Sequence, residues 1–591
     1  MMKKIKYILP AVMTVIFFSC SQLEPEIENN NTFKRVLNDP NWTDGLLING
    51  YSALPYNDNN PFPWDEVATD DAVNNQPTNN FRRMSNGNWT SSNNPEDTWT
   101  SCNRGIMYIN EFLSLVDTVN FYNEDPLRNM LYRFRLSGEA YALRGALKYY
   151  LLRNHGGIST DGTLLGTPIY NEFSKNSADF NKPRDTFEDC VNSANADFDK
   201  ALSMLPYDYR TLGSTDEIPD ILSELKTGTP DQLQKNLNAY NIVFGNAQRQ
   251  RISGRIALAF QVRLALLHAS PAFNLTNDVN LWKKVADLAS KLLKGVTLDP
   301  QGNHYFSAKD IIDNCTVDND LSEFVWRRVK RNSNNMESAN FPPSLQGQGQ
   351  INPTQNFVDA FPMANGYPIT NSASGYNPQY PYNGRDPRFY LTVIYNGCAF
   401  KNLIYTYINS GIDALNFSQT ATRTGYYLRK FLRDDVLVGD VTNTKFHLEP
   451  FIRYTEIFLT YAEAANEAYG PEGDPNGLGY NAKSIIGDIR KRAGITSSDP
   501  YLASITTKEA MRTMIQNERR LELCFEGFRF WDLRRWKSPL VTQTVKGIRI
   551  VSSGAYTIFD VEPRSYQDYM MYGPIPYSEI LKYKFIQNNG W

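Results

Sequence analysis

Six segments with helical periodicity, most of them in neighbouring pairs, constrain the fold of this chain most strongly. Each repeats apolar side chains at spacings of three and four residues, and together they span residues 128–153, 185–204, 251–269, 281–293, 451–469 and 481–493. Alanines such as Ala257, Ala265 and Ala462 line these segments, and side chains that small let helices approach closely. The pattern predicts a mainly α fold, a superhelix of degenerate tetratricopeptide-like hairpins with few short strands.

Long polar segments rich in aromatic residues separate the predicted helices. They cover about 56–100, 206–250, 300–350 and 363–450, and loops of that length are usually functional in compact domains. The chain has 13% aromatic residues, including 35 tyrosines, and aromatic rings stack well on the apolar faces of sugars. The alternative, that most of these rings fill a core, stays open. The formal net charge of −3 argues against binding to nucleic acid.

The first residues have the pattern of an export signal. Lys3, Lys4 and Lys6 precede an apolar run over 7–18 that is too short to span a bilayer. A cysteine follows at Cys20, as in a bacterial lipoprotein cleavage box. We therefore expect a signal peptide over 1–19, an acylated Cys20 with a tether over 20–40, and a single domain over 41–591. A plain secretory signal with an incidental cysteine is the alternative.

Several classes of enzyme are disfavoured by the motifs. The four histidines show no HExxH spacing, and no phosphate-binding loop or nucleophile elbow occurs. The five cysteines after Cys20 form no CxxC pair, so we expect buried thiols. No metal or other cofactor is predicted, although a structural calcium ion stays open. Glycoside hydrolysis by carboxylates alone is not excluded by motif.

A run near the C-terminus carries a family resemblance. Residues 517–536 read NERRLELCFEGFRFWDLRRW, and supporting blocks include RDPR at 385–388, RYTE at 453–456 and QNNGW at 587–591. In these blocks, and in the signature region 450–591 as a whole, the chain resembles the SusD/RagB family of Bacteroidetes nutrient-binding outer-membrane lipoproteins.

The resemblance implies both a fold and a function. It implies a SusD-like helical superhelix with ligand-binding loops, at about 56–100, 300–350 and 363–450. The implied function is non-catalytic capture of an oligosaccharide or polysaccharide and its delivery to a SusC-like TonB-dependent transporter. Acylated Cys20 would anchor the chain in outer-membrane lipid, facing the cell surface. A RagB-type peptide-binding lipoprotein is the main alternative, and a carboxylate-dependent glycoside hydrolase is the lesser one.

Three glutamates in the signature could be mistaken for catalytic acids. Glu518, Glu522 and Glu526 recur every four residues, so on a helix they share one face and repel one another unless cations lie among them. A glycosidase instead needs two carboxyls across a cleft. We interpret the three as structural. The cations expected to neutralise them are Arg519, Arg520 and Arg529.

Candidate ligand residues were chosen as exposed-looking aromatic residues with polar neighbours. Trp89, in the polar sequence NGNWT, is the first choice. Asp70 and Asp71 could accept hydrogen bonds from hydroxyl groups, with helix capping or solvation as the alternative. Trp326 fits either a core position or the ligand site. For Arg385, the favoured alternative is that it anchors its loop. The full set is Trp64, Asp70, Asp71, Trp89, Trp326, Tyr376, Tyr380, Tyr382 and Arg385.

Overall fold

The computed structural model describes residues 39–56, 64–122, 124–401, 403–405, 407–495, 498–538, 543–551, 554–583 and 585–591. The predicted signal peptide over 1–19, Cys20 and the tether up to residue 38 lie outside these ranges. Within them, no helix has the length and apolar composition that crossing a bilayer requires.

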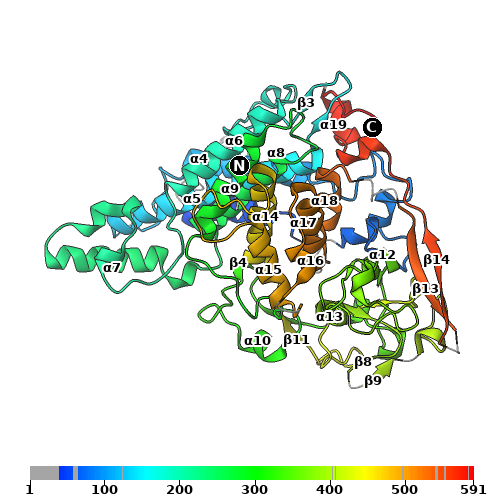
Figure 1. Cartoon of the computed structure of the whole chain (residues 1–591). Coiled ribbons are helices and arrows are strands. Elements are labelled where there is room, and N and C mark those ends of the chain that lie inside the picture. Colours follow the sequence, from blue (N-terminus) through cyan, green and yellow to red (C-terminus); the bar gives the residue numbers. More distant parts are fainter. Residues whose placement is uncertain are drawn as a thin grey trace, which may run out of the picture.

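Helices stacked one on the next form the body of the molecule, which confirms the mainly α fold (Figure 1). Each packs against a neighbour in the stack, and an arm carrying α7 extends from one end. In chain order they are α3 (Pro40–Ser52), α4 (Trp99–Leu115), α5 (Pro126–His155), α6 (Phe187–Leu202), α7 (Pro230–Phe244), α8 (Gly254–Ala269), α9 (Val279–Leu293), α14 (Tyr454–Tyr469), α15 (Ala482–Arg492) and α17 (Lys508–Glu522).

Local signals explain where these helices begin and how closely they pack. The Asp125 carboxylate accepts a hydrogen bond from the Arg128 amide at 2.9 Å, and Pro126 occupies the first turn of α5. A Cβ at Gly105 of α4 would lie 2.4 Å from the Cβ of Ala53, so only glycine allows α3 and α4 to approach this closely. The alanines predicted to line the helices are buried. Small residues therefore set the spacing of the stack.

The long segments between helices build a second core. Short helices such as α12 (Gln355–Ala360), α13 (Pro387–Thr392) and α18 (Arg529–Arg535) lie in or beside it. Phe357 packs against Phe361 and Phe525 with ring centroids 5.0 and 5.3 Å apart, and Phe361 packs against Phe389 at 5.8 Å. Many aromatic residues of the predicted ligand-binding loops therefore fill a core, the alternative that the sequence left open.

Strands are short and pair locally. The described residues contain seven antiparallel two-stranded ladders, several of them between distant segments. They pair β1 (Ala72–Asn74) with β6 (Ile351–Pro353), β4 (Phe324–Arg327) with β12 (Pro450–Arg453), β5 (Arg331–Ser333) with β11 (Lys445–His447), β7 (Val393–Ile394) with β10 (Tyr427–Leu428), β2 (Gly157–Ile158) with β3 (Leu164–Leu165), β8 (Cys398–Phe400) with β9 (Leu403–Tyr405), and β13 (Val545–Ile550) with β14 (Tyr556–Glu562). The β13–β14 hairpin runs along the edge of the second core (Figure 1).

A buried charge network joins the second core to the helical stack. Glu522 of α17 contacts Arg492 of α15 at 2.7 Å, Arg388 of α13 at 3.0 Å and Arg453 of β12 at 3.4 Å. Burial alone would raise the pKa of Glu522, but these three cations outweigh it and hold the pKa below its ordinary value. One carboxylate therefore connects three segments that are far apart in the sequence.

The other two signature glutamates follow the same rule. Arg388 donates to Glu518 at 2.5 Å, and Glu526 lies 2.8 Å from Arg453 and 2.7 Å from Lys430. Their structural role agrees with the sequence-based interpretation, but the predicted source of the neutralising cations was wrong. The cations come from distant segments because arginines next in sequence on a helix point away from the glutamate face.

We predict that Glu522→Gln destabilises the protein by about 3–5 kcal/mol, because it leaves buried guanidinium groups without their counter-charge. Urea denaturation followed by circular dichroism measures the free energy of unfolding. Glu509→Gln, at the exposed start of the same helix, is the matched control and should change stability by no more than about 0.5 kcal/mol. Equal effects of the two substitutions would contradict the network's structural role.

Candidate functional site

The predicted acidic pair is buried in ion pairs. Asp70 contacts Arg520 and Arg529 at 2.9 Å, and Asp71 contacts Arg520 at 2.5 Å. Burial would raise the pKa of Asp70, but the two arginines lower it to about 2. The expectation of exposed ligand groups was wrong, as was the alternative of capping or solvation. These aspartates connect the N-terminal segment to the signature region. Their partners, Arg520 and Arg529, are two of the three arginines that were expected to neutralise the glutamates.

The predicted tryptophans are buried as well. Trp64 is 6% exposed and packs in the second core, 6.5 Å from Phe525. Trp89 is 3% exposed, its ring lies 4.9 Å from that of Trp591, and its indole N–H donates to Asn94 at 2.9 Å. The expectation that these rings are exposed platforms was wrong, because short polar neighbours in the sequence do not prevent an indole from packing under a distant segment.

Trp326 is also a packed ring, although it borders a cleft. Its centroid lies 4.8 Å from that of Phe451, and its indole N–H donates to the Gln250 carbonyl at 3.2 Å. It lines a polar cleft of about 560 Å³ together with Arg255 and Arg327. Because the ring is only 6% exposed, it contributes one edge of the cleft's wall and no open face.

The predicted tyrosines lie together on one loop before α13. Tyr380 is 55% exposed, and Tyr376 and Tyr382 are half-buried. Arg385 is 1% exposed and donates to the carbonyls of Val358 and Phe361, which anchors the loop as favoured for it. Its guanidinium lies 5.6 Å from the centroid of the Tyr376 ring. Buried in this way, Arg385 supports the tyrosines from beneath.

Further tyrosines, which the sequence analysis did not choose, extend this group. The ring of Tyr382 lies 4.4 Å from Tyr395, which stacks on Phe389 at 5.1 Å. The hydroxyl of Tyr390 donates to the Tyr382 carbonyl at 2.6 Å. From the hairpin, the hydroxyl of Tyr556 donates to the Pro378 carbonyl at 2.7 Å. We call Tyr376, Tyr380, Tyr382, Tyr390, Tyr395 and Tyr556 the tyrosine face.

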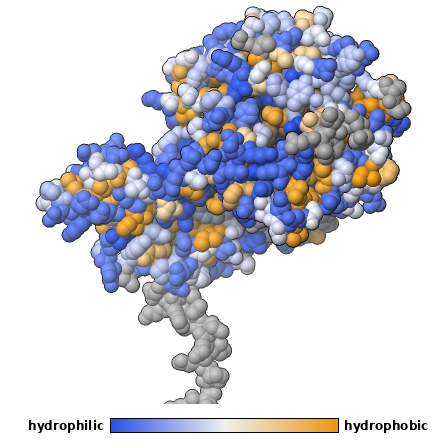
Figure 2. Space-filling view, turned by 90° about the horizontal axis from the view of Figure 1, so that it is seen from below, coloured by the Kyte–Doolittle hydropathy of each residue, from blue (hydrophilic) through white to orange (hydrophobic). Residues whose placement is uncertain are grey.

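The density of tyrosine in residues 376–395 is a signal that could have identified most of the tyrosine face, whereas Tyr556 reaches it only through the fold. Neighbouring surface in the same loops also carries exposed apolar residues, including Phe417 at 62% and Leu437 at 56%. Figure 2, seen from below, shows apolar groups scattered in small patches among hydrophilic ones. The loops over 363–450 therefore combine a packed interior with exposed rings.

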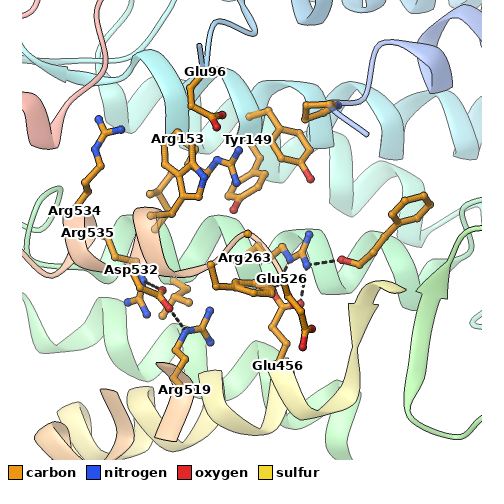
Figure 3. Close-up of a pocket in the computed structure, with 18 of the residues that line it drawn as sticks. Glu96, Tyr149, Arg153, Arg263, Glu456, Arg519, Glu526, Asp532, Arg534 and Arg535 are labelled. Atoms are coloured by element: carbon orange, nitrogen blue, oxygen red, sulfur yellow. Dashed lines mark hydrogen bonds and ion pairs between the residues drawn. The ribbon is translucent and has the colours of Figure 1, made fainter. Parts of the chain in front are cut away.

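A cavity of about 140 Å³ lies where α5, α8, α14 and α18 meet (Figure 3). We call it the central cavity. Its walls include Tyr149 and Arg153 of α5, Arg263 of α8, Glu456 of α14, and Trp531 and Arg534 of α18. Nothing in the sequence pointed to this cavity, because its wall is assembled from segments far apart in the chain.

Three of the four carboxylates that line the central cavity are held in ion pairs. Glu456 accepts from Arg263 at 2.6 and 2.7 Å, and Asp532 and Glu526 are paired with Arg519 and Arg453. The fourth is Glu96, which is 9% exposed; its Oε1 is buried and accepts no hydrogen bond within the described part of the chain. Burial raises the pKa of Glu96 to about 8, and the nearby carboxyl of Asp65 adds to this rise.

Other reactive groups are not gathered into a centre. Among the residues that the structure describes, no three His, Cys, Asp or Glu side chains lie close enough to hold a metal ion. Cys102, Cys190, Cys315, Cys398 and Cys524 are buried free thiols, as predicted. Burial raises the pKa of Cys524 to about 11, which keeps this thiol protonated and unreactive at neutral pH.

A helical stack joined to a loop-built second core that presents a tyrosine face defines the class of this protein. Two family models match it: one described as the SusD family over residues 317–591, the other as starch-binding associating with outer membrane over 26–215. Over both matched parts the chain is SusD-like.

Known relatives agree with this assignment. The SusD-like protein P38 of Formosa agariphila is 33% identical over 87 residues, which are 14% of this chain and only 16% of that relative's length. A SusD-like protein of Bacteroides fragilis matches with a TM-score of 0.68 and 21% identity, over 94% of this chain and 98% of its own. The surface glycan-binding protein A of Bacteroides fluxus matches with a TM-score of 0.56 and 15% identity, over 94% and 100%. At these identities the solved structures show the fold alone.

We predict that Glu96→Gln gains stability relative to the natural protein as pH rises from 5 to 8. In the unfolded chain the carboxyl loses its proton near its ordinary pKa, whereas the folded protein keeps it up to about pH 8. The free energy of unfolding of the natural protein therefore falls over this window, and a neutral amide removes that fall. Urea denaturation at several pH values measures it. If the difference in free energy of unfolding between the two proteins did not change with pH, that result would contradict a buried, protonated Glu96 carboxyl.

Proposed function

We propose that this protein is a cell-surface lipoprotein that binds an oligosaccharide or polysaccharide at the tyrosine face and delivers it, uncleaved, to a SusC-like TonB-dependent transporter. The observation that carries the proposal is the gathering of Tyr376, Tyr380 and Tyr382 on one anchored loop, with Tyr380 more than half exposed. Aromatic rings offer apolar faces for pyranose rings, and their hydroxyls form hydrogen bonds with sugar hydroxyls.

The tyrosine face is held in place before any ligand arrives. The Arg385 amide donates to the Tyr390 hydroxyl at 3.1 Å, and that hydroxyl donates in turn to the Tyr382 carbonyl. Tyr382 stacks against Phe389 of the second core at 5.9 Å. Binding to a preorganised surface costs less conformational entropy than binding to mobile loops.

A non-catalytic role is supported by the state of the buried carboxylates. Glycoside hydrolysis requires two carboxyls that face one substrate bond. In the central cavity Glu456, Glu526 and Asp532 are neutralised by arginines, so Glu96 has no free carboxylate across the cavity from it. The signature glutamates are likewise structural. Binding without cleavage fits these environments.

Relatives support the ligand class and the location. One solved Bacteroides fragilis relative, with a TM-score of 0.67, 20% identity and 93% of this chain covered, is described as a SusD-like carbohydrate-binding protein. The family model over 26–215 is described as starch-binding associating with outer membrane. With acylation at Cys20, these likenesses favour attachment to the outer membrane beside a transporter.

We predict that Tyr380→Ala and Tyr376→Ala each weaken binding of the cognate oligosaccharide by about 2- to 10-fold, the range of a lost aromatic contact. Isothermal titration of the chain without residues 1–20, against plant, microbial and host oligosaccharides with peptides alongside, measures this. Tyr577→Ala is the matched control, because Tyr577 is 49% exposed on the separate helix α19 (Tyr577–Lys582). It should bind like the natural protein.

Three results would overturn parts of the proposal. Unchanged affinity in both loop variants would remove the tyrosine face from the site. Binding of peptides with no response to any glycan would make the protein a peptide-binding member of the RagB type. Release of shorter sugars during a time course with the purified protein would show catalysis.

A further inference from the structure

We propose that the central cavity is a second ligand site, which binds a single acidic sugar through its carboxylate. The central cavity is separate from the tyrosine face and is lined by different elements. Its wall holds two cations without an ion-pair partner, hydrogen-bond donors without acceptors, and aromatic rings.

Arginine charge exceeds carboxylate charge in the wall of the central cavity. Six arginines line it, against four carboxyl groups. Four of these six arginines pair with carboxylates, and the other two, Arg153 and Arg534, have no carboxylate within 4 Å in the described part of the chain. Burial raises the pKa of Glu96, in the wall, to about 8, so this carboxyl is mostly neutral at pH 7. Burial also raises the pKa of Asp65, to about 6; its carboxylate interacts with Arg153 and offsets part of that charge at neutral pH. An anion would balance the remaining positive charge.

Both arginines keep N–H donors of the kind that bind a carboxylate. Arg534 is 4% exposed; its Nε donates to the Met571 carbonyl at 3.0 Å, while Nη1 and Nη2 are buried without a hydrogen-bond partner in the described part of the protein. Arg153 donates through Nε to Asn154, which leaves both of its Nη groups available. Guanidinium groups bind carboxylates through paired N–H donors, so unsatisfied Nη groups favour that ligand.

Stacking on aromatic rings holds the Arg153 guanidinium in position to bind a ligand. It lies 3.9 Å from the centroid of the Trp531 ring and 4.9 Å from that of Tyr150. In Figure 3, Glu96 extends from above toward Arg153, and Tyr149 lies beside them. When protonated, the Glu96 carboxyl adds another donor on the same side. The Arg153 guanidinium and the Glu96 carboxyl therefore lie close together on one side of the central cavity.

The volume of the central cavity limits the ligand to a single sugar. A volume of about 140 Å³ has room for roughly ten water-sized positions, which suits one hexuronic acid and excludes an oligosaccharide. The Tyr149 ring, also in the wall, supplies apolar surface for a pyranose ring. Charge, donors and size together point to a monosaccharide that carries a carboxylate.

Isothermal titration of the full mature chain with sodium glucuronate and sodium galacturonate tests this, with glucose, galactose and acetate for comparison. At least one uronate should bind ten or more times more tightly than its neutral counterpart and than acetate. Arg153→Gln should weaken that binding tenfold or more, because it removes the guanidinium that pairs with the carboxylate. Arg128→Gln, at the partly exposed start of the same helix, should have no effect.

The folded state of Arg153→Gln is checked by circular dichroism and thermal unfolding. Should that variant fail to fold, Tyr149→Phe removes only a hydroxyl from the wall and should weaken uronate binding about threefold or more. Equal affinity for glucose and glucuronate, binding of acetate as tight as that of the uronates, or no binding of either uronate would overturn the proposal. Tyr380→Ala should leave uronate affinity unchanged, so this test is independent of the tyrosine face.

Discussion

The structure depends on guanidinium and carboxylate groups that are paired away from water. Glu522 alone connects a helix of the stack, a strand and a short helix of the second core, through Arg492, Arg453 and Arg388. A buried pair of this kind adds little net stability compared with apolar packing, but loss of one partner costs several kcal/mol. The network therefore acts mainly on specificity, because other arrangements of the loops would leave charges buried and unpaired.

The buried ion pairs explain why irregular segments, although long, can present a defined surface. The segment over 363–450 has only short ladders and short helices for local structure. Arg388 nevertheless attaches it to Glu518 of α17, and Lys430 attaches it to Glu526 just beyond that helix. Phe389 and Phe361 pack beneath, and Arg385 satisfies carbonyls that would otherwise be buried without partners. The tyrosine face is the outer layer of this arrangement. In the central cavity the same pairing is incomplete, and the donors left over at Arg153 and Arg534 are the basis for a second site.

A feature was predictable from the sequence when residues close together in the chain decide it. The ranges of six helices were readable because apolar spacing along one segment decides which face is buried, as in α5 and α14. The ranges of α3, α4 and α7 were not predicted, and α7 lies within the segment 206–250 that was expected to separate helices. The structural role of Glu518 and its neighbours was readable from repulsion on one helical face. Trp89 was misjudged because its sequence neighbours are polar while its cover, Trp591, comes from the far end of the chain. Glu96 and Arg153 carried no local signal at all.

The sequence by itself determined the elements and their chemistry: amphipathic helices with small contact residues, charged residues that must find partners, and a tyrosine-dense loop before α13. These follow from interactions within a few residues along the chain. Only the tertiary structure decided which arginine neutralises which carboxylate, which aromatic rings are covered, and which donors remain free in the central cavity. Which groups pair and which are buried depends on segments hundreds of residues apart. The free energies of pairing and burial arise only when the assembled core excludes water.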